Sequence, residues 1–279
     1  MKTIVVRKLV ILLSFMGVLF NEALANDLRQ DLVHEVISRS GVKEVVDAFP
    51  SLLKAGIRQG ATQAGANDPG QLERIDQIVD SAWRPEDIMH TVVATLGEKL
   101  SEQQLNDARQ WLSSPLGKKI TQMEIDGGQL ANLEAMEQQL PELLKKFKGS
   151  AREKMFDAFD RATGATDVAV DTAIAIQLAM SAAMLSGSER ASEQAFRQIR
   201  ESIESNRFML RGMIEQQVFN SYIYTYRNLS DNELEAYLAF SQSPSGAKYA
   251  QVMHEALKQA LIAPAEVVGK NIMRSYMPG

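Results

Sequence analysis

The chain contains no cysteine among its 279 residues, only three histidines, and 6% aromatic residues. The absence of cysteine excludes disulfide bonds, thiolate nucleophiles, zinc ribbons and iron–sulfur clusters. Basic residues are fewer than acidic ones, 30 against 35, and the formal net charge of −5 argues against a nucleic-acid partner. Hydrophobic residues, in contrast, make up 45% of the chain, as in a folded protein of one or two domains.

The first 25 residues have the three parts of a secretory signal peptide. Lys2, Arg7 and Lys8 precede an apolar run over residues 9–20, and small residues then allow cleavage after Ala25. The run is shorter than the roughly twenty residues that a membrane-spanning helix needs, although an uncleaved anchor is the alternative. We therefore expect export to the periplasm through a Sec-type pathway. Residues 1–25 hold three basic side chains and one acidic side chain, so the mature chain carries a net charge of −7.

The mature chain has the hydrophobic spacing of helices nearly throughout. In residues 219–226, for example, apolar or aromatic side chains recur at i, i+3, i+4 and i+7. Alternating runs of β-branched residues, which would indicate strands, are missing. The sequence therefore predicts an all-α fold.

The most apolar stretch of the mature chain covers residues 168–185. Asp171 and Gln177 interrupt it, and both would be costly in the hydrocarbon of a bilayer. We expect a buried core helix rather than an integral membrane segment, and a binding groove lined by this helix remains an alternative.

Two stretches of the chain resemble each other at a fixed offset of 129 residues, namely 100–124 and 229–253. A weaker similarity relates residues 40–45 to residues 163–168, in the same order. These matches predict two tandem helical bundle units, 26–150 and 151–279. The repeated motif comprises Leu100, Ser101, Leu105, Trp111, Ser114, Pro115, Gly117 and Lys119 in the first unit, and Leu229, Ser230, Leu234, Phe240, Ser243, Pro244, Gly246 and Lys248 in the second.

The motif indicates a helical corner. Ser101 and Ser230 are each followed three residues later by Gln or Glu, which is the pattern of a capping box at a helix start. The Ser-Pro steps predict the end of that helix and the start of the next. The two glycines suit a close approach at the corner, and the two lysines suggest a salt bridge or a ligand contact. We favour a structural corner over a binding site.

This pattern, L-S-x-x-[EQ]-L-x5-[WF]-x2-S-P-x-G-x-K behind a signal peptide, resembles the bacterial domain of unknown function 2059 family. The resemblance covers both copies of the motif and implies an exported helical protein, without an activity to carry over. The first copy departs from the aromatic-rich stretch that precedes the cap, since His90, Val93 and Gly97 stand where the second copy has aromatic residues.

Signals for catalysis are sparse. His34-Glu35 and His254-Glu255 begin like the zinc-binding motif H-E-x-x-H, but Ser38 and Lys258 stand where the second histidine would be needed. Phosphate-binding glycine loops and a nucleophile elbow are missing, and acidic pairs such as Asp157 and Asp160 suit solvated helix faces. We therefore assign no catalytic residue, cofactor or metal ligand from the sequence, and leave enzymatic activity open.

The absence of such signals beside a repeated packing motif favours a non-catalytic binding or envelope-assembly module. Its partner would be a protein or an envelope ligand. A periplasmic hydrolase acting on cell-wall or lipid substrates is the first alternative. A peripheral membrane module that uses residues 168–185 is the second.

Overall fold

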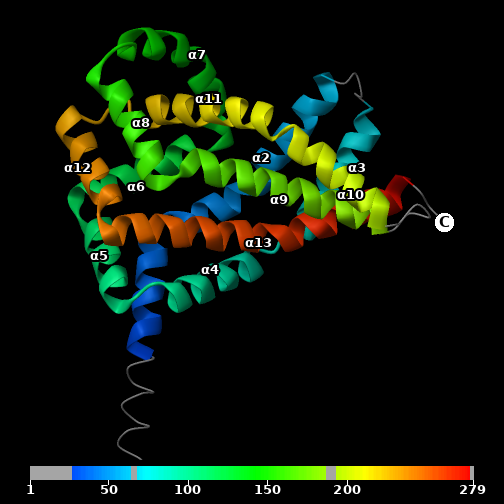
Figure 1. Ribbon diagram of the computed structural model, residues 1–279, viewed down its shortest axis with the longest axis horizontal. Helices are drawn as coiled ribbons and strands as arrows, with labels where there is room; N and C mark the ends of the chain where they lie inside the picture. The colour runs from blue at the N-terminus through cyan, green and yellow to red at the C-terminus, as the bar shows by residue number, and fades with distance from the viewer. Residues whose placement is uncertain (1–26, 64–67, 187–192, 277–279) are drawn as a thin grey trace, which may run out of the picture.

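The structure is a computed structural model that describes residues 27–63, 68–186 and 193–276. The expected signal peptide lies outside these residues. The described residues form helices joined by short turns, without a strand among them, which confirms the all-α prediction. Figure 1 shows long helices lying side by side, with α13 running beneath α9 across the molecule.

The first described helix covers residues 27–39. It is followed by α2 (Val42–Gln63), α3 (Pro69–Ala82), α4 (Pro85–Lys99), α5 (Glu102–Ser113), α6 (Pro115–Gly127) and α7 (Leu130–Phe147). The second half contains α8 (Ala151–Thr163), α9 (Ala165–Ser186), α10 (Glu193–Ser205), α11 (Arg207–Thr225), α12 (Asp231–Gln242) and α13 (Pro244–Tyr276).

Helices of the two halves follow one another in the same order, with α7 between them. Both α2 and α9 have 22 residues, and both α5 and α12 have 12 residues. Gly41 and Gly164, which precede α2 and α9, have positive φ angles of 72° and 66°. Glycine adopts this left-handed conformation without the clash that a Cβ would cause, so it allows the sharp turn into the next helix. The last helix of each half differs in length, since α6 has 13 residues and α13 has 33.

Two large hydrophobic clusters form the interior, and each takes residues from both halves of the chain. The first, which we call the N-terminal core, combines helix 27–39, α4 and α5 with Val252, Met253 and Ala256 of α13. The second, the C-terminal core, combines α8, α11 and α12 with Ile120 of α6 and Phe147 of α7. The helix that follows the Ser-Pro corner of each half therefore completes the core of the other half. The unit boundary at residue 150 stays a prediction, but it does not separate two cores.

The apolar helix α9 is buried on one face only. Val170, Ile174 and Ala179 are buried, whereas the residues between them are half-buried or exposed. The helix packs closely on α13, where a Cβ on Gly269 would lie 2.4 Å from the carbonyl oxygen of Met180. None of the described helices combines the length and apolar character that crossing a bilayer requires.

Candidate functional site

The two predicted capping boxes form at the starts of α5 and α12. Ser101 Oγ accepts a hydrogen bond from the Gln104 N–H (3.2 Å), and Gln104 Oε1 accepts one from the Ser101 N–H (2.9 Å). Ser230 and Glu233 repeat both bonds at 3.3 and 2.8 Å. The prediction from spacing is therefore confirmed, because each pair satisfies two backbone donors that a helix start leaves without partners.

The Ser-Pro corners are also built alike. Ser114 Oγ accepts a hydrogen bond from the Gly117 N–H (2.9 Å) and donates one to the Trp111 carbonyl (2.7 Å). The same bonds join Ser243 to Gly246 and Phe240, at 3.0 and 2.6 Å. A Cβ on either glycine would lie 2.0 Å from the carbonyl oxygen of the aromatic residue. Glycine is thus required at both corners, as predicted.

The other motif residues join the two halves of the chain. Trp111 and Phe240 stack on each other, with ring centroids 4.6 Å apart, and the four motif leucines are buried. Lys119 Nζ lies 2.7 Å from Glu233 Oε1, in the capping box of the other half. Lys119 and the capping hydrogen bonds lower the pKa of Glu233 to about 2. Lys248 instead donates to Gln251 (3.3 Å), so the salt bridge that we considered for both lysines forms at one of them.

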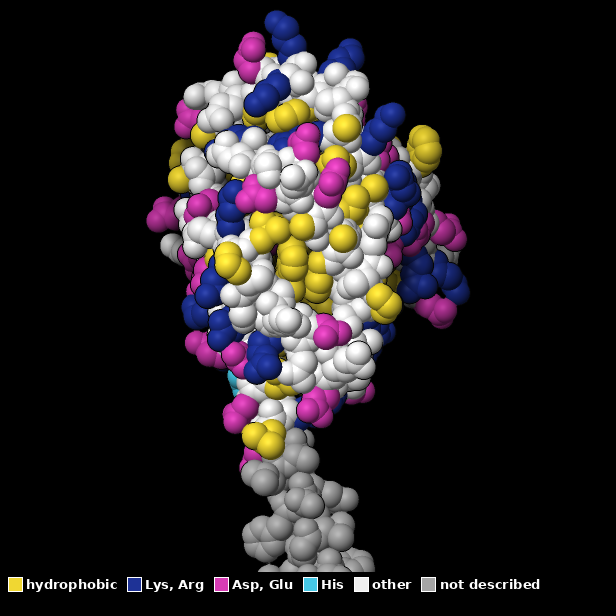
Figure 2. Space-filling model, turned by 90° about the vertical axis from the view of Figure 1, so that its left-hand side faces the viewer, with side chains coloured by type: hydrophobic (Ala, Val, Ile, Leu, Met, Phe, Trp, Pro, Cys, Tyr) yellow, Lys and Arg dark blue, Asp and Glu magenta, His cyan; other side chains and the backbone are white. Residues whose placement is uncertain are grey.

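The end of the molecule that carries α5 and α12 is mixed in charge (Figure 2). Lysine and arginine side chains are interspersed with acidic ones around a central strip of hydrophobic side chains. This face therefore presents no continuous basic surface of the kind that binds a nucleic acid.

Sequence reasoning missed a pair of equivalent arginines. Arg29 Nη2 donates to the carbonyls of Gly97 and Leu100, both at 2.6 Å. Arg152 donates to the carbonyls of Tyr226 and Leu229. The acceptors differ by the motif offset of 129, and each arginine lies twelve residues before a left-handed glycine. The twelve-residue spacing from each arginine to the following glycine is the sequence pattern that could have identified this pair.

A half-buried carboxyl group lies beside the C-terminal core. Glu124 Oε1 accepts hydrogen bonds from the hydroxyls of Tyr226 (2.7 Å) and Tyr237 (2.8 Å), and burial raises the pKa of this carboxyl. The side chain lines an internal cavity of about 90 Å³, together with Trp111 and Phe240 of the motif. The equivalent position in the other half is Met253, so the repeat gave no sign of this group.

A hollow that we call the apolar groove lies between α2, α9 and α13. Its volume is about 400 Å³, within the usual range for small-molecule sites. Its lining is Val45, Val46, Phe49, Trp83, Ala165, Val168, Ala169, Thr172, Ala173, Ile176, His254, Leu257, Lys258 and Leu261. The exposed side of the apolar stretch 168–185 thus contributes to a groove, which was the alternative to a wholly buried helix.

The aromatic wall of the apolar groove is fixed by a proline. Pro50 lies inside α2 and has no N–H to donate to the carbonyl of Val46, four residues earlier. The Trp83 indole Nε1–H donates to that carbonyl instead, at 3.1 Å. The indole also stacks on Phe49, with ring centroids 4.8 Å apart. The hydrogen bond and the stack together hold Trp83 in one orientation.

Two nitrogen-containing side chains on α13 reach the apolar groove. His254 Nδ1 is buried without a hydrogen-bond partner, and burial lowers the pKa of this imidazole. For Lys258, the described residues provide no carboxylate within ion-pair distance, although it lies beside an apolar surface. The groove therefore has a cation, that of Lys258, at the edge of an apolar lining.

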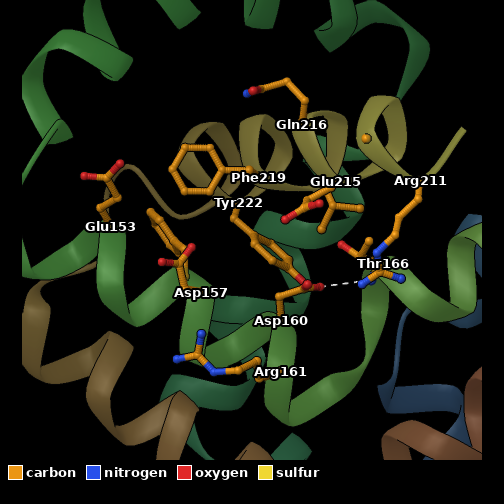
Figure 3. A pocket seen from close by; sticks show the side chains of 13 residues that line it. Glu153, Asp157, Asp160, Arg161, Thr166, Arg211, Glu215, Gln216, Phe219 and Tyr222 are labelled. Carbon is orange, nitrogen blue, oxygen red and sulfur yellow. Dashed lines mark hydrogen bonds between the residues drawn. The ribbon is translucent and has the colours of Figure 1, made fainter. Parts of the chain in front are cut away.

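A second hollow, the polar cleft, lies between α8, the start of α9 and α11 (Figure 3). Its volume is about 670 Å³. Carboxylates contribute much of the lining, and Asp157 and Asp160, which we expected on a solvated face, are among them. Asp160 Oδ1 accepts a hydrogen bond from the Thr166 N–H at 2.9 Å and so caps the start of α9. The other lining residues are Glu153, Phe156, Arg161, Thr166, Arg211, Gly212, Glu215, Gln216, Val218, Phe219 and Tyr222.

The two incomplete zinc motifs remain isolated. Glu35 pairs with Arg39 and Arg109. Glu255 pairs with Lys99. In the described ranges, no three His, Asp or Glu side chains gather in a way that could hold a metal ion.

The fold and the corners define an all-helical protein whose two halves share their cores. Residues 86–146 match the model of a family described as an uncharacterized protein conserved in bacteria, DUF2059. This match covers the first copy of the motif and leaves the second outside. Comparison with curated proteins gave no match, and neither did comparison with solved structures.

Proposed function

We propose that this chain is an exported, non-catalytic binding module that holds the apolar chain of an anionic amphiphile in the apolar groove. The observation that carries the proposal is the lining of that groove, which is apolar except for Thr172, His254 and Lys258. Ligand sites of this kind combine an apolar wall with a few polar groups that orient the ligand. The Trp83–Phe49 stack supplies a flat surface for an acyl chain, and Lys258 supplies a cation for a carboxylate or phosphate head.

Export is part of this proposal. It is supported by the basic start, apolar run and cleavage site of residues 1–25. Sequencing the N-terminus of the protein recovered from a periplasmic fraction tests it, and the expected first residue is Asn26. Recovery with the cytoplasm, with residues 1–25 retained, contradicts it.

We also infer that the two halves are copies of one helical unit. The support is the equivalent arginines, which bind equivalent carbonyls, together with the matching caps and corners. In this view the groove arises where the copies differ, because α13 continues for 33 residues and supplies one wall, whereas α6 ends after 13.

The groove can be tested with the two tryptophans of the chain, Trp83 and Trp111. Trp111→Phe leaves Trp83 as the only indole, and phenylalanine is the residue that the second copy carries at this position. Titration with dodecanoate should change the Trp83 emission. Decanoate, which has two CH2 groups fewer, should bind up to about fifteenfold more weakly, because each buried CH2 contributes about 0.8 kcal/mol.

Two groove variants and one control sharpen the test. Ala169→Phe should fill the groove and abolish binding, whereas Ala236→Phe on the exposed side of α12 should leave it unchanged. Lys258→Gln should weaken binding of dodecanoate and leave binding of the uncharged dodecyl maltoside intact. An unchanged Trp83 spectrum at saturating dodecanoate, or equal binding by Ala169→Phe, would refute the proposal.

A second candidate function is association with a membrane surface. Phe208, at the start of α11, is 89% exposed, and Met209 and Met213 beside it are also exposed. Exposed apolar side chains in a group are typical of a contact with a membrane or a partner. This group differs from the stretch 168–185 that the sequence suggested. Flotation with phosphatidylglycerol vesicles, compared between the parent and Phe208→Ser, tests it.

A further inference from the structure

A third hollow, which we call the helix-end pocket, lies where the ends of α6 and α11 meet. Its volume is about 240 Å³, and its lining comes from these two helix ends, from Asn132 of α7 and from the turn that follows α11. A Cβ on Gly127 would lie 2.7 Å from Thr225 Oγ1, so the glycine leaves this hydroxyl uncovered. The helix-end pocket shares no lining residue with the apolar groove or the polar cleft.

A guanidinium group is held in this pocket without a carboxylate partner. Arg227 Nη1 donates to the Tyr224 carbonyl at 2.5 Å, and the guanidinium lies over the Tyr224 ring, 3.9 Å from its centroid. Among the described residues, no carboxylate forms an ion pair with Arg227. A guanidinium has five N–H donors in one rigid plane, so most of those of Arg227 are left for a ligand.

A carboxylate lines the same pocket and also lacks a charged partner. Asp126 Oδ1 accepts a hydrogen bond from the Gln122 amide at 2.9 Å, and the Asp126 carbonyl accepts one from the Asn132 amide at 2.5 Å. Within the described ranges, no cation forms an ion pair with Asp126, and Arg227 in the same lining is no exception. The pocket therefore presents a cation and an anion that are held at separate points.

Two hydroxyls of the lining are without a partner as well. Thr225 and Tyr224 are 7% and 4% exposed, and neither hydroxyl makes a hydrogen bond in the described part of the chain. Unlike the hydroxyls of Tyr222 and Thr166, these two are not closed off from solvent. They belong to buried residues that line a hollow, so a molecule in the hollow can bond to them.

We propose that the helix-end pocket binds a small free α-amino acid. The carboxylate of the ligand pairs with Arg227, its ammonium group pairs with Asp126, and the Thr225 hydroxyl adds a hydrogen bond. The volume lies below the usual range for drug-sized ligands, which suits a molecule of this size. A simple anion or cation would pair with one of the two charges only, and a sugar would pair with neither. The site does not depend on the ligand proposed for the apolar groove.

The test is a titration of the ¹⁵N-labelled protein with L-alanine, followed by nuclear magnetic resonance. Binding should shift the signals of the Gly127 amide and of Arg227 Nε, and the affinity should fall as NaCl rises, because partly exposed charges are screened by salt. Propionate lacks the ammonium group and L-alaninamide lacks the carboxylate, so each should bind about tenfold more weakly. Absence of these shifts at 10 mM L-alanine, or equal binding of propionate, L-alaninamide or glucose, would overturn the proposal.

Charge variants locate the two ends of the ligand. Arg227→Gln should weaken L-alanine binding about tenfold. Its matched control is Arg200→Gln, because the Arg200 guanidinium also lies over an aromatic ring, that of Phe196, but outside the pocket. Asp126→Asn should weaken binding at least threefold, whereas Asp157→Asn, an exposed change on α8, should not. Equal effects of the pocket variants and their controls would overturn the proposal.

The Thr225 hydroxyl gives a second readout, the melting temperature. Thr225→Val replaces this hydroxyl by a methyl group and should weaken L-alanine binding at least threefold. Because the hydroxyl has no partner in the described chain, the melting temperature should stay unchanged or rise. Gly127→Ala should abolish binding by covering the hydroxyl, whereas Gly128→Ala, beside the pocket lining, should not. A lower melting temperature for Thr225→Val, or its binding L-alanine as tightly as the parent, would overturn the proposal.

Discussion

Replacement of Arg152 by methionine is expected to destabilise the protein far more than the same change at Arg29. Arg152 is 6% exposed and donates to the carbonyls of Tyr226 and Leu229. Its guanidinium also lies over the ring of Phe147, 5.0 Å from the centroid. Methionine keeps most of the apolar stem but removes every donor. The change therefore isolates the hydrogen bonds from the packing.

The magnitude follows from the partners that are lost. The Tyr226 carbonyl keeps a bond from the Leu229 N–H at 3.0 Å, so the main loss is at the Leu229 carbonyl. A buried carbonyl without a donor costs about 1–3 kcal/mol, and the cation–π contact adds about 0.5–1 kcal/mol. The partner Asp231 is mostly exposed, so its ion pair adds less than about 1 kcal/mol. Methionine carries no charge that must be desolvated on folding, and this gain offsets part of the sum. We expect the free energy of unfolding to fall by about 2–3 kcal/mol in total.

Arg29 provides the matched control. It donates to the equivalent carbonyls, but it is only partly buried, so water can replace its N–H groups. We expect a loss of about 1 kcal/mol for Arg29→Met. Urea denaturation followed by circular dichroism measures both, and thermal unfolding should show a decrease of roughly 5–10 °C for Arg152→Met. A loss below about 1 kcal/mol for Arg152→Met, or an equal loss for both variants, would refute the reasoning.

Three further predictions follow from the shared cores and corners. Gly246→Ala should lower the free energy of unfolding by about 1–3 kcal/mol, because a Cβ would lie 2.0 Å from the Phe240 carbonyl oxygen. The control Gly56→Ala, in open space on α2, should be neutral or stabilising, and urea denaturation of both variants measures the difference. Fragments 26–150 and 151–279 should be poorly helical alone and regain helicity when mixed, because α13 completes the N-terminal core and α6 completes the C-terminal core. Circular dichroism measures the helicity, and cooperative unfolding of either fragment alone contradicts the prediction. The lowered pKa of Glu233 means that its ionised carboxylate should stabilise the fold above about pH 5 and cease to do so as pH falls toward 2. Glu233→Gln should therefore lose about 0.5–1 kcal/mol of stability at pH 6 and nothing near pH 2. Denaturation of the parent and the variant across this range should show their free energies of unfolding converging at low pH, and a difference that stays constant contradicts the prediction.

Local features of the fold were predictable from local spacing. The starts of α5 and α12 follow from the capping boxes, and their ends follow from the Ser-Pro steps, because both signals act within four residues. The clash that requires Gly117 and Gly246 is also local, since it involves carbonyls six residues earlier. These predictions depended on backbone sterics and hydrogen bonding, which neighbouring residues largely decide.

The candidate sites were not predictable in this way. Glu124 meets Tyr226 and Tyr237 across 102 and 113 residues, and no local pattern marks the meeting. The apolar groove is formed by α2, α9 and α13 together. Only the contribution of α9 was visible in the sequence, as an apolar stretch that Asp171 and Gln177 interrupt. The pairing of Trp83 with the carbonyl freed by Pro50 spans 37 residues and depends on how α3 meets α2.

The sequence by itself thus determined the helical class, the caps, the corners and the need for glycine within them. It also determined the repeated order of its motifs, because each copy carries the same residues at one offset. Only the tertiary structure decided that each half completes its core with a helix of the other. It also decided where an apolar groove and a polar cleft open on neighbouring faces of α9. The physical reason is that hydrophobic burial is not directional: it requires that α6 and α13 be covered, but only the packing of the whole chain settles which helices cover them.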